Sequence, residues 1–162
     1  MQKISPFLWF NNDAEEAVNL YTSIFPNSKI ISTTRYEPES AKAMGKEEGS
    51  VMTITFELEG EEITVINGGP AFKLNEAMSL TVACETQEEV DKYWEALTAD
   101  GGQESQCGWL KDKFGLSWQI IPVQMFQLMS QGGEVSRRAR QAMFKMKKFD
   151  IKKLEEAAAG KE

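Results

Sequence analysis

Residues 13–21, DAEEAVNLY, and residues 86–94, TQEEVDKYW, are two copies of nearly the same amphipathic helix. Each copy opens on a side-chain oxygen suited to an N-cap, from Asp13 or Thr86, and carries a glutamate three residues later. That arrangement satisfies free amides at a helix start. The apolar residues of each copy then share one stripe: Ala17, Leu20, Tyr21 and Ile24 in the first, and Val90, Tyr93, Trp94 and Leu97 in the second. A repeat of this length predicts one structural motif that the chain uses twice.

Short apolar segments surround both helices and predict the strands of each motif. Around the first helix they lie at residues 4–10, 29–36, 51–58 and 63–67, and around the second at residues 79–84, 103–110 and 116–121. Residues 51–58 alternate, with Met52, Ile54, Phe56 and Leu58 on one face. The turn Glu59-Gly60-Glu61 predicts a hairpin. Each motif therefore reads strand–helix–strand–strand–strand.

Two segments lie outside this pattern. Residues 37–50 are polar and contain glycine, which predicts a loop or a mobile flap. Residues 123–162 are helical in pattern, with a stripe through Val135 and Ala139 and a further helix capped by Asp150. Methionines in this tail favour packing within the chain or between subunits over a cofactor site.

The charge of the chain is unevenly distributed. Residues 134–162 hold nine Lys or Arg and five Asp or Glu, a net charge of +4. The rest of the chain must therefore carry −11 to give the total of −7. An acidic body argues against nucleic acid or an anionic membrane as partner. No apolar run approaches the ~20 residues of a membrane span, and no signal peptide precedes the first strand, so we expect a cytoplasmic protein.

The sequence contains no histidine. This absence excludes a serine–histidine or cysteine–histidine nucleophile and removes the commonest transition-metal ligand. The two cysteines, Cys84 and Cys107, do not make a disulfide framework, and we expect buried thiols. Cys107 remains a weaker candidate nucleophile, with Lys111 or Lys113 to lower its pKa.

Several runs carry a resemblance to a known family. They are the N-x-D-A-E-E-A-x-x-x-Y run at 11–21, CGWLKD at 107–112, FGLSWQ at 114–119 and AMFKMKKFDIKKL at 142–154. Together they resemble the PhnB-like branch of the vicinal oxygen chelate superfamily, which includes glyoxalase I, bleomycin-resistance proteins and extradiol dioxygenases. Members of this branch are often labelled demethylubiquinone methyltransferases. No glycine pair of the chain stands where a methyl-donor site of the doubly wound type needs it, so we do not expect methyl transfer.

The resemblance implies an α+β fold. Two βαβββ modules, at about residues 1–70 and 76–122, would form a curved mixed sheet around a cavity, commonly within a homodimer. The C-terminal helices, residues 123–162, would pack on this domain or on the dimer partner.

Catalytic members of the superfamily hold one divalent metal in that cavity. The matching ligand positions fall at Pro6, at Ile66 or Asn67, at Ser79 and at Gln119. Proline and isoleucine have no donor atom, and amide oxygens are weak ligands for Zn or Ni. We therefore expect no tightly bound metal and no cofactor.

The remaining candidates describe a small-molecule pocket of aromatic walls and a few polar groups. The candidate ligand-binding residues are Phe7, Trp9, Asn67, Ser79, Trp109, Ser117 and Gln119. Three alternatives stay open. Ser79 and Gln119 could simply satisfy each other, Trp109 and Trp118 could be core residues, and Asp112 could cap the turn before Gly115.

Three functions are compatible with these features. The favoured one is binding of a small apolar or aromatic molecule without a metal, with residues 37–50 gating the cavity and the tail closing a homodimer. The second is a metal-dependent lyase, isomerase or dioxygenase that uses Gln119 with Glu57 or Glu62. The third is an interaction module that dimerises through the tail.

Overall fold

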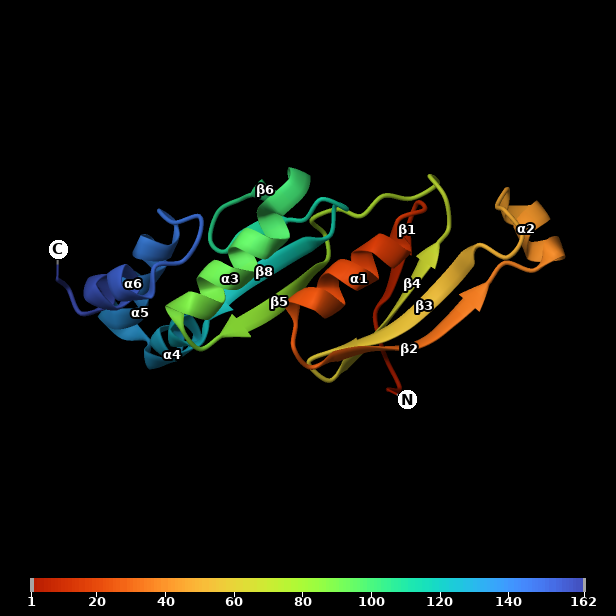
Figure 1. Cartoon of the computed structure of the whole chain (residues 1–162). Helices are drawn as coiled ribbons and strands as arrows, with labels where there is room; N and C mark the ends of the chain where they lie inside the picture. Colours follow the sequence, from red (N-terminus) through yellow and green to blue (C-terminus); the bar gives the residue numbers. More distant parts are fainter. Residues whose placement is uncertain (1, 162) are drawn as a thin grey trace. The chain divides into compact units, whose positions relative to one another are not determined.

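The computed structural model describes residues 2–161, which form two compact units that divide between Leu74 and Asn75 (Figure 1). We call them the N-terminal unit and the C-terminal unit and describe each by itself. Within the described residues, no helix has the length and apolar character to cross a membrane.

The N-terminal unit holds one four-stranded sheet and two helices. Its elements are β1 (Phe7–Phe10), α1 (Ala14–Ile24), β2 (Ser28–Arg35), α2 (Pro38–Met44), β3 (Val51–Leu58) and β4 (Glu61–Asn67). The strand order is β1-β4-β3-β2, in which β1 runs parallel to β4 and the other pairs are antiparallel. The predicted βαβββ order of the first motif is thus confirmed.

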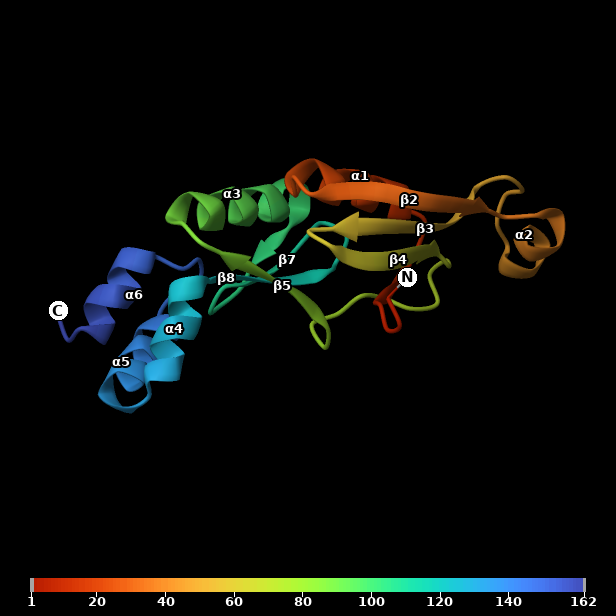
Figure 2. The same ribbon diagram turned by 90° about the horizontal axis from the view of Figure 1, so that it is seen from below.

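The core of this unit lies between α1 and one face of the sheet (Figure 2). The helix buries Ala17, Tyr21 and Ile24 of the predicted stripe, whereas Leu20 is half-buried and Val18 is buried in its place. The sheet buries alternate residues of β3 and β4, because successive strand side chains point to opposite faces. The rings of Tyr21 and Phe56 stack at 6.4 Å between centroids. This periodicity is the reason why the sequence predicts the core well.

Three local expectations for this unit were wrong. Asp13 makes no side-chain cap bond, and the amide of Ala14 donates instead to Oδ1 of Asn67 at 3.0 Å. The predicted loop 37–50 contains α2, which buries only Ala41 and so leaves little trace in hydrophobic patterning. A β-bulge shifts the register between Thr34↔Thr53 and Arg35↔Val51, so Val51 rather than Met52 is buried.

The C-terminal unit repeats the same topology and adds three helices. Its elements are β5 (Ser79–Cys84), α3 (Gln87–Thr98), the 3₁₀ turn η1 (Ala99–Gly101), β6 (Gln103–Glu104), β7 (Trp109–Lys111), β8 (Ser117–Pro122), α4 (Val123–Gln131), α5 (Gly133–Met143) and α6 (Ile151–Ala158). The order β5-β8-β7-β6, with β5 parallel to β8, matches that of the first sheet. The α+β class, the two βαβββ modules and the C-terminal helices are therefore confirmed.

The strand predicted at 103–110 is two short strands joined by a turn. Cys107 and Gly108 have φ of +57° and +81° in that turn. A Cβ at Gly108 would lie 2.5 Å from the Phe149 ring, so only glycine lets the tail approach here. The capping box expected at the start of α3 forms only in part. Thr86 accepts from the amide of Glu89 at 3.3 Å, but the Glu89 side chain accepts from the amide of Glu85 and not from that of Thr86.

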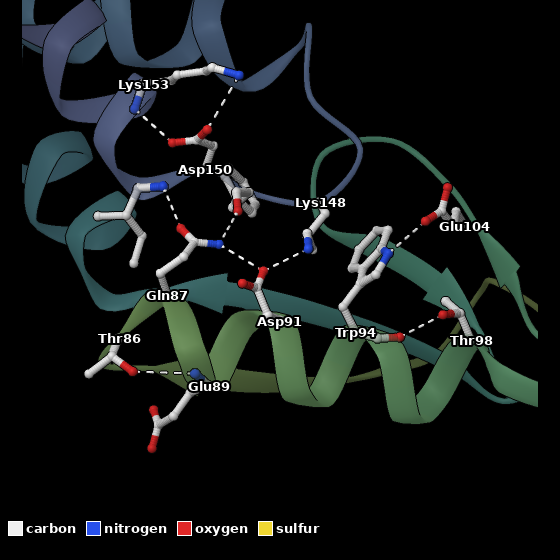
Figure 3. A network of polar contacts seen from close by, with 12 residues as sticks. Thr86, Gln87, Glu89, Asp91, Trp94, Thr98, Glu104, Lys148, Asp150 and Lys153 are labelled. Atoms are coloured by element: carbon white, nitrogen blue, oxygen red, sulfur yellow. Dashed lines mark hydrogen bonds and ion pairs between the residues drawn. The ribbon is translucent and has the colours of Figure 1, made fainter.

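The tail packs on α3 through Gln87 (Figure 3). The Gln87 side chain donates to the carbonyl of Phe149 and accepts from the amide of Ile151, both at 2.9 Å. Lys148 forms an ion pair with Asp91 at 2.7 Å. Phe149 and Leu154 are fully buried, so the helices after residue 123 share the core of the C-terminal unit.

Candidate functional site

The sheet of the C-terminal unit has two faces of different chemistry. Leu110, Trp118 and Ile120 are buried on the face that α3 covers. Strand register places the alternate residues on the other face: Ser79 pairs with Ser117, Trp109 with Gln119, and Lys111 with Ser117. We call this second face the open face.

A pocket of about 380 Å³ lies at the β6–β7–β8 side of this sheet. Its lining includes Glu76, Gln103, Ser105, Trp109, Lys111 and Ser117. Both the volume and the mixture of one aromatic face with several polar groups are typical of small-molecule sites.

Ser117 is the most informative residue of the pocket. It is only 1% exposed, because β5 and β7 flank it on both sides. Its Oγ has no hydrogen-bond partner among residues 2–161. Since buried hydroxyls are nearly always paired, an unpaired one that lines a pocket marks a position where a bound molecule can complete the bond.

The neighbouring polar groups are largely committed. Nε2 of Gln119 donates to Oγ of Ser79 at 2.9 Å, which matches the alternative that these two side chains satisfy each other. Lys111 Nζ lies 2.5 Å from Glu76 Oε1. The hydrogen bond from Lys111 is the main reason why the pKa of the exposed Glu76 carboxyl lies below its ordinary value.

Glu104 belongs to the rim of the same pocket but faces α3. Its Oε1 accepts from the indole Nε1 of Trp94 at 2.8 Å, and its Oε2 lies 3.7 Å from Lys147 Nζ. Each carboxylate that lines the pocket therefore has a cation beside it. Among the described residues that line the pocket, none brings an unpaired charge to Trp109 and Ser117.

The other three candidate residues lie in the N-terminal unit. Phe7 is 61% exposed. Trp9 donates from Nε1 to the carbonyl of Gly69 at 2.9 Å and meets Phe72 edge-on at 5.0 Å. A Cβ at Gly68 would overlap the Trp9 ring, so glycine is required there.

Asn67 is a structural residue of this unit. Besides capping α1 through Oδ1, it donates from Nδ2 to the carbonyl of Val51 at 3.1 Å, and its own carbonyl accepts from the hydroxyl of Tyr36. These bonds occupy the polar atoms that a ligand would need. The cavity that was predicted between the two modules stays a prediction.

The positions implied for a metal do not offer a fitting donor set. Pro6 has no donor, Asn67 is committed, and Ser79 and Gln119 are neutral groups bonded to each other. Across residues 2–161, His, Cys, Asp and Glu form no group of three or more suited to an ion. Stripping water from a dication needs stronger ligands than these, so we derive no step through a metal.

The alternative carboxylates, Glu57 and Glu62, lie directly opposite each other on β3 and β4. Lys29 pairs with Glu57 at 3.5 Å, which compensates part of their repulsion. Two carboxylates beside a lysine do not complete a metal site by themselves.

The sequence did not lead us to assign Glu76, Gln103 or Lys111 to a pocket. The alternation in β7 that places Lys111 on the face of Trp109 could have identified Lys111, because their spacing is two. Glu76 lies in the segment before β5, outside any periodic element, and no pattern marks it.

A family model described as 3-demethylubiquinone-9 3-methyltransferase matches residues 2–121. The solved structure of a Bacillus cereus PhnB protein, which carries the same description, is 40% identical, covers 75% of this chain and 99% of its own length, and superposes with a TM-score of 0.66.

Two more distant structures show likeness of fold alone. PA1353 from Pseudomonas aeruginosa is 18% identical, with coverage of 75% of this chain and 98% of its own and a TM-score of 0.61. The fosfomycin resistance protein FosX from Listeria monocytogenes is 17% identical, with coverage of 72% and 87% and a TM-score of 0.51. The search of curated proteins found no match.

Proposed function

Since the chain belongs to the PhnB-like family described as 3-demethylubiquinone-9 3-methyltransferase, within the vicinal oxygen chelate superfamily, we propose that it binds a small, flat and largely apolar molecule without a tightly bound metal. The site is the pocket on the open face of the C-terminal sheet. The observation that carries this proposal is the buried and unpaired hydroxyl of Ser117 beside the ring of Trp109.

The chemistry of the pocket restricts the ligand. Trp109 supplies a flat apolar surface, and Ser117 supplies one hydroxyl that can donate or accept. The charges at the rim are paired with each other, as Lys111 is with Glu76. A neutral aromatic molecule with one hydroxyl or carbonyl group therefore fits better than an anion or a cation.

We do not extend the family description to methyl transfer by this chain. Methyl-donor sites of the doubly wound type use a glycine-rich turn from a parallel strand into a helix. Here the residues between β1 and α1 are Asn11, Asn12 and Asp13, and those between β5 and α3 are Glu85 and Thr86. Neither turn contains glycine.

The test is an amide chemical-shift titration with 2-naphthol, a flat neutral ring with one hydroxyl. We expect shifts at residues 109–111 and 117–119, together with quenching of tryptophan fluorescence. Ser117→Ala should weaken binding about threefold to tenfold, because one neutral hydrogen bond is worth roughly 0.5–1.5 kcal/mol. Ser130→Ala, on α4 outside the pocket, is the matched control and should bind as the parent protein does.

A stability measurement distinguishes a binding role from a structural one. Ser117→Ala removes a buried hydroxyl that has no partner, so the free energy of unfolding should stay equal or rise by up to about 1 kcal/mol. Weaker binding with unchanged or higher stability supports the proposal. Shifts confined to other surfaces, or equal affinity in the Ser117 variant, would contradict it.

A homodimer is part of the same proposal. Phe126 on α4 and Phe144 after α5 are 52% and 65% exposed, and large apolar side chains of this kind favour burial against a partner. Light scattering of the double variant Phe126→Ser and Phe144→Ser should give a monomer if these two side chains lie in the dimer interface. A dimer that survives both changes would exclude them from the interface.

A further inference from the structure

A second concavity, of about 750 Å³, lies among the tail helices and involves α5, α6 and the segment between them. We call it the tail groove. Its charged lining residues are Arg138, Lys145, Lys148, Lys153, Lys161 and Asp150. Five cations and one carboxylate thus surround one hollow, in a chain whose net charge is −7.

Two of these cations are neutralised within the unit (Figure 3). Lys148 pairs with Asp91 at 2.7 Å, and Lys153 lies 3.4 Å from the carboxylate of Asp150. For Arg138, Lys145 and Lys161, no ion pair with a carboxylate is formed among residues 2–161. The tail groove therefore carries an excess of positive charge at these three cations.

Arg138 is held in a defined orientation. Its Nε donates to the carbonyl of Ala158 at 3.0 Å, at the end of α6. Gly160 has φ of +73°, and a Cβ there would lie 3.3 Å from Nη1, so the guanidinium rests closely against this turn. This hydrogen bond uses Nε alone and leaves both Nη groups available to other acceptors. A pre-oriented guanidinium fork is the geometry that proteins use for phosphate.

The apolar part of the lining comes from Ala142, Met146 and Ala157. Ala142 on α5 and Ala157 on α6 are half-buried members of the groove, and their short side chains leave room between the two helices. A molecule with an anionic head and a modest organic body can therefore occupy the hollow. Its volume lies within the range of small-molecule sites.

We propose that the tail groove binds a small polyanion of the diphosphate type, with Arg138 and Lys145 as its principal ligands. Three cations without an ion pair match two adjacent phosphate groups better than they match a single monoanion. The acidic remainder of the chain, −11 outside residues 134–162, repels a long polyanion such as nucleic acid, so the site suits a small molecule. This site is separate from the open-face pocket and does not depend on its function.

The test uses inorganic pyrophosphate, without metal ions and with a chelator present, at physiological salt. Titration followed by amide chemical shifts should move residues 138–145 and 157–161 and leave 109–119 unchanged. Arg138→Gln combined with Lys145→Gln should lower the affinity at least tenfold. Arg137→Gln is the matched control, because Arg137 neighbours Arg138 on α5 but pairs with Glu134 and does not line the groove. It should change the affinity less than twofold.

If the Arg138 change disturbs the packing of α6, the single variant Lys145→Gln still tests the proposal. Lys145 is exposed, and its side chain makes no hydrogen bond or ion pair with residues 2–161. This single change should weaken pyrophosphate binding at least threefold with an unchanged melting temperature.

Three results would overturn the proposal: no binding at physiological salt, an equal loss in Arg137→Gln, or altered self-association with unaltered pyrophosphate affinity. The last result would identify the groove as an interface between copies of the chain.

Discussion

Oδ1 of Asn67, the last residue of β4, accepts the amide hydrogen of Ala14 at 3.0 Å and so caps α1 from a strand 53 residues away. A local N-cap would come from Asp13, but the φ and ψ of Asp13, −111° and 15°, lie outside the extended region that capping residues usually adopt. The helix start is therefore fixed to the sheet by a tertiary bond. The same Asn67 side chain also binds the carbonyl of Val51.

This arrangement predicts losses of stability of very different size for two polar side chains, Asn67 and Asp13. Asn67→Ala leaves the amide of Ala14 and the carbonyl of Val51 unpaired in a buried place, so it should lower the free energy of unfolding by about 2–4 kcal/mol. Asp13→Ala removes no cap bond and should cost less than about 1 kcal/mol, the size of a helix-dipole effect. Urea denaturation of both variants measures the difference. Equal losses would show that Asp13 caps the helix in solution.

The same residue explains where sequence reasoning succeeded and where it did not. Periodicity predicted the two modules and most of the buried stripe of each helix, because these depend on spacing along the chain. The alternative that Trp118 is a core residue holds, since Trp118 is buried. Asn67 was assigned to the pocket because the family resemblance puts a ligand position at Ile66 or Asn67, and nothing in the spacing reveals a bond to Ala14. Capping between distant elements requires the register of β1 with β4, which only the folded chain provides.

The residues of the pocket, too, could be predicted from the sequence only where they lie in regular strands. Trp109, Ser117 and Gln119 share a face by alternation, and the structure places them together on the open face. Glu76 reaches that pocket through the ion pair with Lys111, from a segment without regular structure. A contribution of this kind depends on the path of a loop and leaves no periodic signal.

Asp112 gives a second prediction, which concerns the turn before β8. Its Oδ1 accepts from the amides of Phe114 and Leu116 at 2.9 and 3.0 Å, and its Oδ2 accepts from the indole Nε1 of Trp118 at 2.9 Å. The turn-capping alternative for Asp112 is thereby confirmed.

In Asp112→Asn, an amide NH₂ group would face one of these three donors. The free energy of unfolding should fall by about 2–4 kcal/mol, and the tryptophan emission should shift to the red as the Trp118 environment loosens. Asp100→Asn, at an exposed turn with φ of +54°, is the matched control and should be nearly neutral because asparagine tolerates this conformation. A neutral Asp112→Asn variant would contradict the buried network.

The attachment of the tail predicts a dependence on acid. Hydrogen bonds from Lys148 and then Gln87 hold the pKa of Asp91 below its ordinary value of 3.8. A carboxylate with a lowered pKa in the folded state stabilises that state above about pH 4, and the contribution is lost as the pH falls through the folded pKa. The stability difference between the parent protein and Asp91→Asn should therefore shrink between about pH 4 and pH 2.

Glu95→Gln serves as the control for this measurement, since the Glu95 side chain is exposed on the same helix and makes no hydrogen bond or ion pair with residues 2–161. A change with pH that both variants share does not come from the Lys148 contact. A constant difference for Asp91→Asn would mean that this contact contributes nothing to folding.

The two thiols give the last prediction, because their surroundings differ. Cys84 is fully buried, and burial, with a smaller effect of the Glu89 charge, raises the pKa of its thiol to about 12. Cys107 is half-buried in the positive-φ turn before Gly108, so the expectation of a buried thiol holds for Cys84 alone. Since the thiolate is the reactive form, a thiol of such high pKa inside the core is inert at neutral pH.

An aromatic disulfide reagent should therefore modify one thiol in the native protein and two in guanidinium chloride. Cys107→Ser should abolish the native reaction, whereas Cys84→Ala should keep it. Rapid native modification of Cys84 would mean that β5 opens far more readily than its burial against α3 implies.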